Sequence, residues 1–310
     1  MPSPLDSTYG AWFVSLFIET ILYGMGALQA WIYFTGRPTD AISVKSTVLL
    51  VLALETIQVT FFFRSSYFRF VERFGILQTD LIWADSLQLL AAYLSAFAVQ
   101  IYFASRIDKL TKARGKFGLS AIGLYTIFLL AFVQIVAGIT QTIRTYQIRS
   151  YLKIDETKAI TTLQTAASVA CDLLITTYLC LFLTRQKGEI KKTNYMVDML
   201  IYDAINRGSL TAVSSCLTMV LFLALPDTFW FFLGLAPSSK LYMNSMLATL
   251  NTRQRLRDKI ATVDKGWNSI PMATLATSNS PKKTRGQASI AAVDFETASV
   301  GQSSVIGIVL

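Results

Sequence analysis

The sequence predicts an all-α integral membrane protein, a seven-transmembrane-helix bundle with an outside N-terminus, a cytosolic C-terminus and a disordered C-terminal tail. Three observations predict this class. The 310-residue chain is 53% hydrophobic, with a mean hydropathy of +0.47, and is too apolar for an ordinary soluble domain. Its apolar residues form seven runs that can span a bilayer. Its lysines and arginines lie in short clusters between these runs, as in membrane proteins.

The seven runs are separated by loops that carry charged residues. The first run follows an N-terminus without Lys or Arg, and no small-residue cleavage site accompanies it, so we expect a retained helix and not a cleaved signal. The sixth run is the second half of one long helix, 193–225, whose first half we place in the cytosol. The expected spanning segments are about 10–34, 46–63, 81–104, 117–140, 159–184, 209–225 and 228–250.

Two of these helices carry features that indicate how they pack. In the third, small residues recur four apart between Ala91 and Ala98, which is typical of closely packed membrane helices. The seventh opens with the aromatic residues Phe229 to Phe232, which favour the lipid–water interface. It also contains Pro237, so we expect a kink in it.

The lysine and arginine distribution predicts the orientation and the domain boundaries. The first, third and fifth loops and the residues after the last spanning segment, 251–310, hold 20 of these residues, and the opposite side holds 7. Cytosolic loops carry the excess of positive charge, which places the C-terminus in the cytosol. We expect an extracellular or luminal N-terminus at 1–9, a membrane domain at 10–260 and a tail at 261–310. The tail is rich in small and polar residues without a sustained period, so we expect it to be disordered.

The composition also excludes several kinds of chemistry. The chain has no histidine, which removes imidazole bases, His-containing metal sites and His-activated nucleophiles. Its cysteines, Cys171, Cys180 and Cys216, all lie within apolar runs, so we expect small buried side chains and no disulfide. We expect no metal, no cofactor and no nucleic-acid partner. The absence of a glycosylation acceptor leaves the plasma membrane and internal membranes both open.

Charged side chains within the apolar runs are the candidate functional residues. An ionised group at the bilayer centre costs at least about 2.5–3.5 kcal/mol, so each one needs a partner, a proton or water. Lys240 is the one basic residue that we place at mid-bilayer depth, and we expect it to pair with Asp172 or Glu55 in a polar interior cavity. The complete set of candidates is Glu19, Glu55, Asp85, Asp172, Lys240 and Asn244.

The last helix adds a resemblance to a known family. Its segment SKLYMNSMLATLNTR, residues 239–253, resembles the signature of a fungal, mainly basidiomycete, membrane family catalogued as domain of unknown function 6534. The resemblance extends upstream through residues 170–173 and 191–216, within a signature region of about 165–257. Short pieces at Leu22–Gly24 and Val99–Ile107 are also similar to its members. It implies a seven-helix integral membrane protein and no established activity.

We expect a receptor-like function, sensing or signalling through an interior polar site bounded by the second, third, fifth and seventh helices. The expected partners are the lipid bilayer, an unknown small-molecule or lipid ligand and a cytosolic effector. A secondary transporter or channel that uses the buried carboxylates and Lys240 is the alternative, although the two halves share no evident repeat.

Three further interpretations stay open. The polar groups can be structural, joining helices by hydrogen bonds only. Lys240 can carry retinal as a Schiff base, with Asp85 or Asp172 as counter-ion, but the helix has little other rhodopsin character. An intramembrane enzyme is the least favoured class, because no residues have nucleophile–base spacing, and we expect a protein that is not an enzyme.

Overall fold

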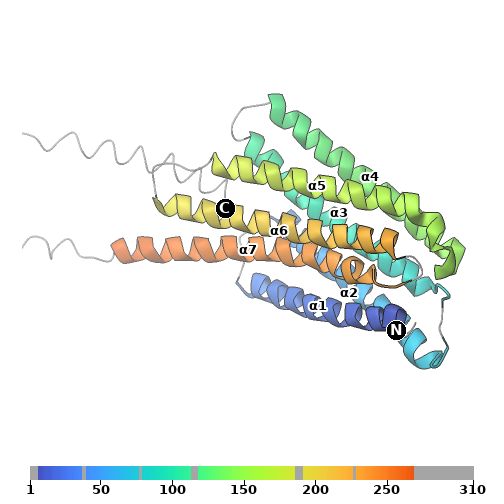
Figure 1. Cartoon of the computed structure of the whole chain (residues 1–310). Coiled ribbons are helices and arrows are strands. Elements are labelled where there is room, and N and C mark those ends of the chain that lie inside the picture. Colours follow the sequence, from blue (N-terminus) through green and yellow to red (C-terminus); the bar gives the residue numbers. More distant parts are fainter. Residues whose placement is uncertain are drawn as a thin grey trace, which may run out of the picture.

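The computed structural model describes residues 6–36, 40–76, 79–112, 118–185, 191–225 and 228–268, which form a bundle of long, roughly parallel helices (Figure 1). Three short helical turns, η1 (Asp6–Gly10), η2 (Phe68–Glu72) and η3 (Tyr151–Thr157), accompany the long ones. No strand occurs in the described ranges. The long helices are α1 (Ala11–Thr35), α2 (Ile42–Tyr67), α3 (Trp83–Lys112), α4 (Gly118–Ile148), α5 (Lys158–Thr184), α6 (Lys191–Ala224) and α7 (Phe232–Asn268).

The helices form a closed ring in sequence order. Each helix packs against the next, and α7 packs against α1 to close the ring. α3 also contacts α5 and α7, which makes it the central helix. Its small residues Ala91, Ala92, Ser95 and Ala96 are buried, and this confirms the predicted close-packing segment, because small side chains let helix backbones approach.

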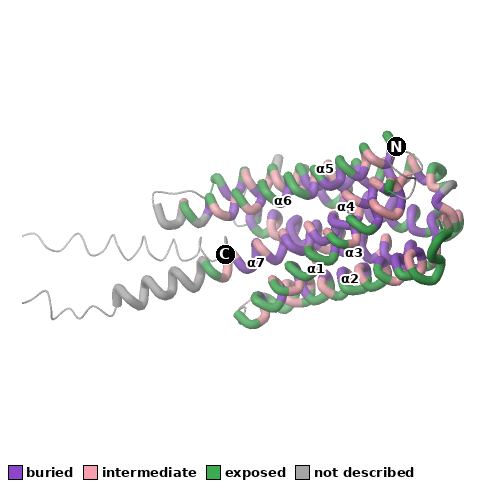
Figure 2. Tube along the Cα trace, turned by 60° about the horizontal axis from the view of Figure 1, so that its bottom comes forward, coloured by how far each residue is buried: buried purple, intermediate pink, exposed green. Residues whose placement is uncertain are grey.

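Six of the described helical segments are long and apolar enough to cross a membrane. The outer surface of the bundle is largely exposed and the inner surface buried (Figure 2). Several large apolar side chains on that outer surface are each more than 60% exposed: Phe13, Phe17, Trp31, Phe132 and Val213. Apolar exposure of this extent suits lipid and not water. The chain is therefore an integral multi-pass membrane protein.

α7 is not among those six segments, because polar residues interrupt its apolar run. It nevertheless lies within the bundle, in contact with α1, α2, α3 and α6. Its polar residues Ser239, Lys240, Asn244 and Asn251 are all buried. A helix that meets mostly protein does not need a lipid-like composition.

Several helices continue beyond the predicted spanning segments. α3 ends at Lys112 and not near Ala104, and α4 ends at Ile148 and not near Thr140. α7 continues as one helix to Asn268 (Figure 1), so residues 261–268 of the predicted disordered tail are helical. An apolar run marks contact with lipid and does not mark the end of a helix, because charged residues also favour helix in water. The rest of the tail, 269–310, lies outside the described residues.

One end of the bundle is closed by a cluster of aromatic side chains. At this end, called the N-terminal end below, the backbone N–H of Phe229 donates to the carbonyl of Ser7 and that of Tyr151 donates to Thr79. Trp12 packs there against Phe62, Tyr151, Phe229 and Phe232.

Phe229, Phe231 and Phe232 are at most 6% exposed. These three rings therefore pack inside the bundle, because the neighbouring helix ends supply enough apolar surface to bury them. Their depth at the lipid–water interface stays a prediction.

The contact between α6 and α7 depends on Gly234. A Cβ built at this position lies 2.5 Å from the backbone oxygen of Ser214 and 2.4 Å from the hydroxyl of Thr218. The Ser214 hydroxyl also donates to the Gly234 carbonyl at 2.8 Å. The two helices therefore approach too closely for any side chain larger than hydrogen.

We expect Gly234→Ala to destabilise the protein by about 2 kcal/mol, the cost of overpacking a filled interface. The measurement is the thermal unfolding midpoint in detergent. Gly24→Ala is the matched control, because a Cβ at Gly24 meets nothing within 4 Å and alanine is the better helix former. Equal midpoints for Gly234→Ala and the wild type would contradict the packing described.

Candidate functional site

The centre of the bundle contains an ion triad of Lys240, Glu19 and Glu55. The Lys240 ammonium lies 2.7 Å from Oε1 of Glu19 and 3.1 Å from Oε2 of Glu55. The three side chains come from α7, α1 and α2, and none of them is more than 1% exposed. Each charge is costly in this setting unless it is paired. The triad therefore joins three helices through their charges.

Neutral side chains complete the surroundings of the triad. The hydroxyls of Ser95 and Ser239 donate to Glu55 at 2.5 and 3.1 Å. The Asn244 amide lies one turn further along α7 and donates to the carbonyls of Leu22 and Lys240 at 2.9 and 2.8 Å. Asn244 thus connects α1 and α7 beside the triad and does not itself contact the charged atoms.

Asp172 belongs to a second cluster. It accepts a hydrogen bond from the hydroxyl of Tyr242 and another from the amide of Gln100 at 3.3 Å. Its other electrostatic partner is Arg207 of α6, which is 2% exposed. Arg207 lies 4.0 Å above the Phe103 ring and donates to Thr176 at 3.3 Å. This cluster joins α3, α5, α6 and α7.

Asp85 belongs to a third cluster, at the N-terminal end. Its carboxylate pairs with Arg69 at 2.8 Å, and both side chains are at most 1% exposed. Arg69 also donates to the carbonyl of Asp80 at 2.9 Å and lies 4.5 Å from the centre of the Trp12 ring. Burial, and secondly the nearby Asp85 carboxylate, raises the pKa of Tyr151 well above its ordinary value. Tyr151 is therefore a neutral hydrogen-bond donor beside this pair.

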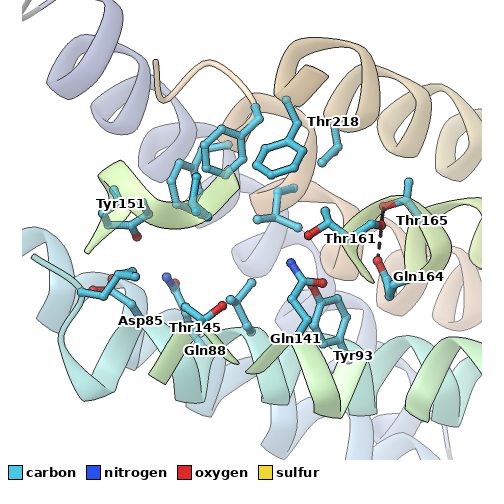
Figure 3. A pocket seen from close by; sticks show the side chains of 17 residues that line it. Asp85, Gln88, Tyr93, Gln141, Thr145, Tyr151, Thr161, Gln164, Thr165 and Thr218 are labelled. Atoms are coloured by element: carbon cyan, nitrogen blue, oxygen red, sulfur yellow. Dashed lines mark hydrogen bonds between the residues drawn. The ribbon is translucent and has the colours of Figure 1, made fainter. Parts of the chain in front are cut away.

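A pocket lies between α3, α4, α5, α6 and α7 at the N-terminal end. Its polar residues stand on several sides of an open space (Figure 3). We call this space the outer pocket. It is lined by the polar side chains of Gln88, Gln141, Thr145 and Thr161 and by the aromatic rings of Phe222 and Phe231. The outer pocket can therefore offer hydrogen bonds on one side and apolar contacts on the other.

A second pocket continues from the first toward the bundle centre. The two share Tyr93, Gln164, Thr165, Thr218 and Leu235 as lining residues. This inner pocket is also lined by Ser239 and Tyr242. Ser239 donates to Glu55 of the triad, and Tyr242 donates to Asp172. The inner pocket therefore touches the triad and the Asp172 cluster through neutral side chains.

The opposite end of the bundle is joined by polar contacts between α7 and the first connection. Arg253 pairs with Asp40, which also accepts a hydrogen bond from Tyr33 at 2.9 Å. The amide of Asn251 donates to the carbonyl of Gln29 at 3.0 Å. α7 is thus held to α1 at both the centre and the end of the bundle.

The structure therefore divides the six predicted residues among three clusters. The predicted contact of Lys240 with Glu55 is confirmed, and the alternative contact with Asp172 is wrong. Asp172 faces Tyr242 and Arg207, because α5 neighbours α6 in the ring while Glu19 and Glu55 approach Lys240 from α1 and α2. Whether the six residues bind a ligand stays a prediction. No group of three or more His, Cys, Asp or Glu residues placed to bind a metal occurs within the described ranges.

Two buried arginines, Arg69 and Arg207, were missed because both stood in segments expected to face water. Lys240 is therefore not the one buried basic residue. The sequence did contain a signal for Arg207, because this residue belongs to a set at helical spacing. The members of the set are all buried: Leu200, Ala204, Arg207, Thr211 and Ser214. Gln134 was also passed over, although it lies inside an apolar run.

The comparison with known proteins finds a family match for the last third of the membrane bundle. The model of a family described as "Family of unknown function (DUF6534)" matches residues 168–255. This segment belongs to the DUF6534 family. The match agrees with the signature region expected at about 165–257. No curated protein and no solved structure matches the chain.

The DUF6534 segment supplies part of the triad and part of the Asp172 cluster, and no residue of the Asp85 cluster. It contains Asp172, Arg207, Lys240 and Asn244, whereas Glu19 and Glu55 lie outside the matched residues. The charged partners of Lys240 thus come from the first two helices. The DUF6534 segment therefore depends on the rest of the bundle for its electrostatic balance.

We expect Lys240→Met to destabilise the protein by about 3–5 kcal/mol, because it leaves two buried carboxylates without their cation. The thermal unfolding midpoint in detergent measures the effect. Lys109→Met, on the exposed surface of α3, controls for the loss of a positive charge. Adding Glu19→Gln to Lys240→Met should recover part of the loss, since it removes one unpaired charge. An unchanged midpoint in Lys240→Met would show that the triad contributes nothing.

Proposed function

We propose that this protein is a seven-span, receptor-like sensor with its N-terminus outside and its C-terminus in the cytosol. A small molecule would enter the bundle from the N-terminal end, and the cytosolic ends of α6 and α7 would carry the response to an effector. The role is one of binding and signalling and not of catalysis, in keeping with a chain that lacks histidine. Both the plasma membrane and an internal membrane suit this arrangement.

The burial of α7 supports the seventh span. Its polar residues are paired within the bundle, and its neighbours α1 and α6 are both apolar enough to cross a membrane. A helix packed along two spanning helices occupies the same depth as they do. Seven spans place the N-terminus and α7's extension on opposite sides, and the excess of Lys and Arg assigns the extension to the cytosol.

The observation that carries the proposal is the pocket that begins at the N-terminal end and reaches the triad and the Asp172 cluster. Toward the opposite end the bundle interior is filled mostly by large apolar side chains, among them Phe103, Ile107, Leu179, Leu247 and Leu250. The charged pair of Arg106 and Asp203 lies at the same end. A polar pocket at one end above an apolar filling at the other suits reception of a ligand from one side. A conducting path would need polar groups through the whole bundle.

α7 provides the connection between the pocket and the cytosolic side. Ser239 and Tyr242 lie at the inner pocket, Lys240 lies between them in the triad, and Arg253 pairs with Asp40 at the far end. A ligand that competes for Ser239 or Tyr242 changes the hydrogen bonds of Glu55 or Asp172. Such a ligand would shift the position of α7 relative to α1 and α2, the two-state element that a receptor requires.

Transport is the second candidate, and the triad itself supports it. Two carboxylates face one ammonium group, so electrical balance inside the membrane calls for one additional proton. Buried carboxylates that exchange a proton are typical of proton-coupled carriers. In that mechanism the inner pocket would open alternately to the two sides. A purely structural role for the polar clusters is the third outcome that experiments can return.

We expect a reporter fused after Leu310 to be cytosolic and a tag before Met1 to be accessible from outside. Seven spans and the positive-inside rule together require this result. The measurement is protease protection of both tags in sealed cells or vesicles. Two tags on the same side would contradict the seventh span, and reversed tags would contradict the orientation.

We expect Thr165→Cys, in a chain whose three cysteines are replaced by alanine, to react with an impermeant methanethiosulfonate added outside. The reagent needs water to reach the thiol, and Thr165 lines both pockets. Val213→Cys, which is 66% exposed on the outer surface of the bundle, should stay unmodified, because lipid and not water covers it. The measurement is the fraction of protein modified, by mass spectrometry.

The side of access separates the candidates. Modification from outside alone agrees with the receptor. Modification from either side, depending on conditions, would favour a carrier. No modification from either side would leave only the structural role.

A further inference from the structure

The inner pocket carries no formal charge on its walls. The charged groups nearest to it, Glu55 and Asp172, are separated from it by Ser239 and Tyr242. Its polar lining consists of hydroxyl and amide groups. A charged ligand would meet no counter-ion in this pocket, and placing one there would cost several kcal/mol. The pocket therefore suits a neutral molecule.

Three hydroxyl groups of the lining have already donated their hydrogens to backbone carbonyls. Thr165 donates to the carbonyl of Thr161 at 2.8 Å, Thr218 to that of Ser214 at 2.9 Å and Ser238 to that of Leu235 at 2.7 Å. A hydroxyl that has donated its hydrogen keeps oxygen lone pairs and can only accept further bonds. A matching ligand must therefore bring its own hydrogen-bond donors.

Gln134 of α4 supplies the opposite polarity. Its side chain lines the inner pocket, is 1% exposed, and neither its amide nitrogen nor its amide oxygen has a hydrogen-bond partner among the described residues. Buried amides in native proteins are nearly always paired, so an orphan one indicates a missing partner. This amide offers a donor and an acceptor to the same ligand.

We propose that the inner pocket binds a small neutral molecule with several hydroxyl groups, a polyol, through Gln134 and the hydroxyl oxygens of α5, α6 and α7. A hydroxyl group donates to the threonine and serine oxygens and accepts from the Gln134 amide, so both halves of the lining are used at once. Tyr242 and Ser239 lie in the same wall and would sense the ligand. The proposal rests on the proposed function, because the ligand must reach the pocket from the N-terminal end.

The experiment is a protection assay on the full chain in nanodiscs. Ser215→Cys, which places a thiol in the inner pocket, is introduced into the chain whose native cysteines are replaced by alanine. The rate of its modification by an impermeant methanethiosulfonate is measured with glycerol or erythritol. Glycolate and ethanolamine serve as charged probes of similar size, and 1-hexanol serves as an apolar probe.

We expect glycerol or erythritol to slow the modification at least fivefold, and the charged and apolar probes to leave it unchanged. Gln134→Leu should raise the polyol concentration needed for half-protection by about tenfold, the effect of losing a neutral hydrogen bond or two. Gln147→Leu, on the exposed surface of the same helix, is the matched control and should leave that concentration unchanged. This control also separates binding from the general effect of polyols on protein surfaces.

Each outcome has a separate meaning. Modification that polyols do not slow, or that the charged or apolar probes slow instead, would overturn the polyol assignment while access of water to the pocket stands. The pocket would then hold water or another ligand. Polyol protection that is equal in Gln134→Leu and the wild type would also overturn it. A thiol that is never modified would refute access itself, and with it the proposed function.

Discussion

The salt bridges of Lys240 decide where α7 lies. A lysine in the middle of a membrane helix is tolerated only when its charge is matched, and here Glu19 and Glu55 match it from two other helices. This requirement brings α1, α2 and α7 together at one depth. It also explains why the helix with the least lipid-like composition is among the best buried. The remaining helices complete the ring around this contact.

The two ends of the bundle are built differently. At the N-terminal end, Arg69 is held between Asp85 and the rings of Trp12 and Tyr151, which fixes the connections above the pocket. At the opposite end the interior is mostly apolar, and its polar contacts include Asp203 with Arg106 as well as Arg253 with Asp40. The pocket and its polar lining consequently lie on one side of the central triad, so the two ends of the bundle differ in their access to a ligand.

The sequence located the buried carboxylates and Lys240 but not the two buried arginines, and of their contacts it predicted only that of Lys240 with Glu55. Glu19 and Lys240 are 221 residues apart and were both recognised as unusual for lipid, yet nothing in the chain indicates that they meet. Asp172 was expected beside Lys240 because both lie near mid-bilayer, and depth alone does not specify on which side of a helix a residue stands. Arg207 was assigned to the cytosol because charge in a partly polar helix suggests exposure to water.

The sequence by itself determined the membrane class, the number and order of long helices among the described residues, and six of the polar residues that are buried away from lipid. These follow from local hydrophobicity and helical period, which each segment carries alone. Only the tertiary structure decided the division of the charges into three clusters and the place of the pocket. It also decided which polar groups, such as Gln134, have no partner. Those properties depend on how each helix is rotated in the ring, which is set by contacts between residues far apart in the chain.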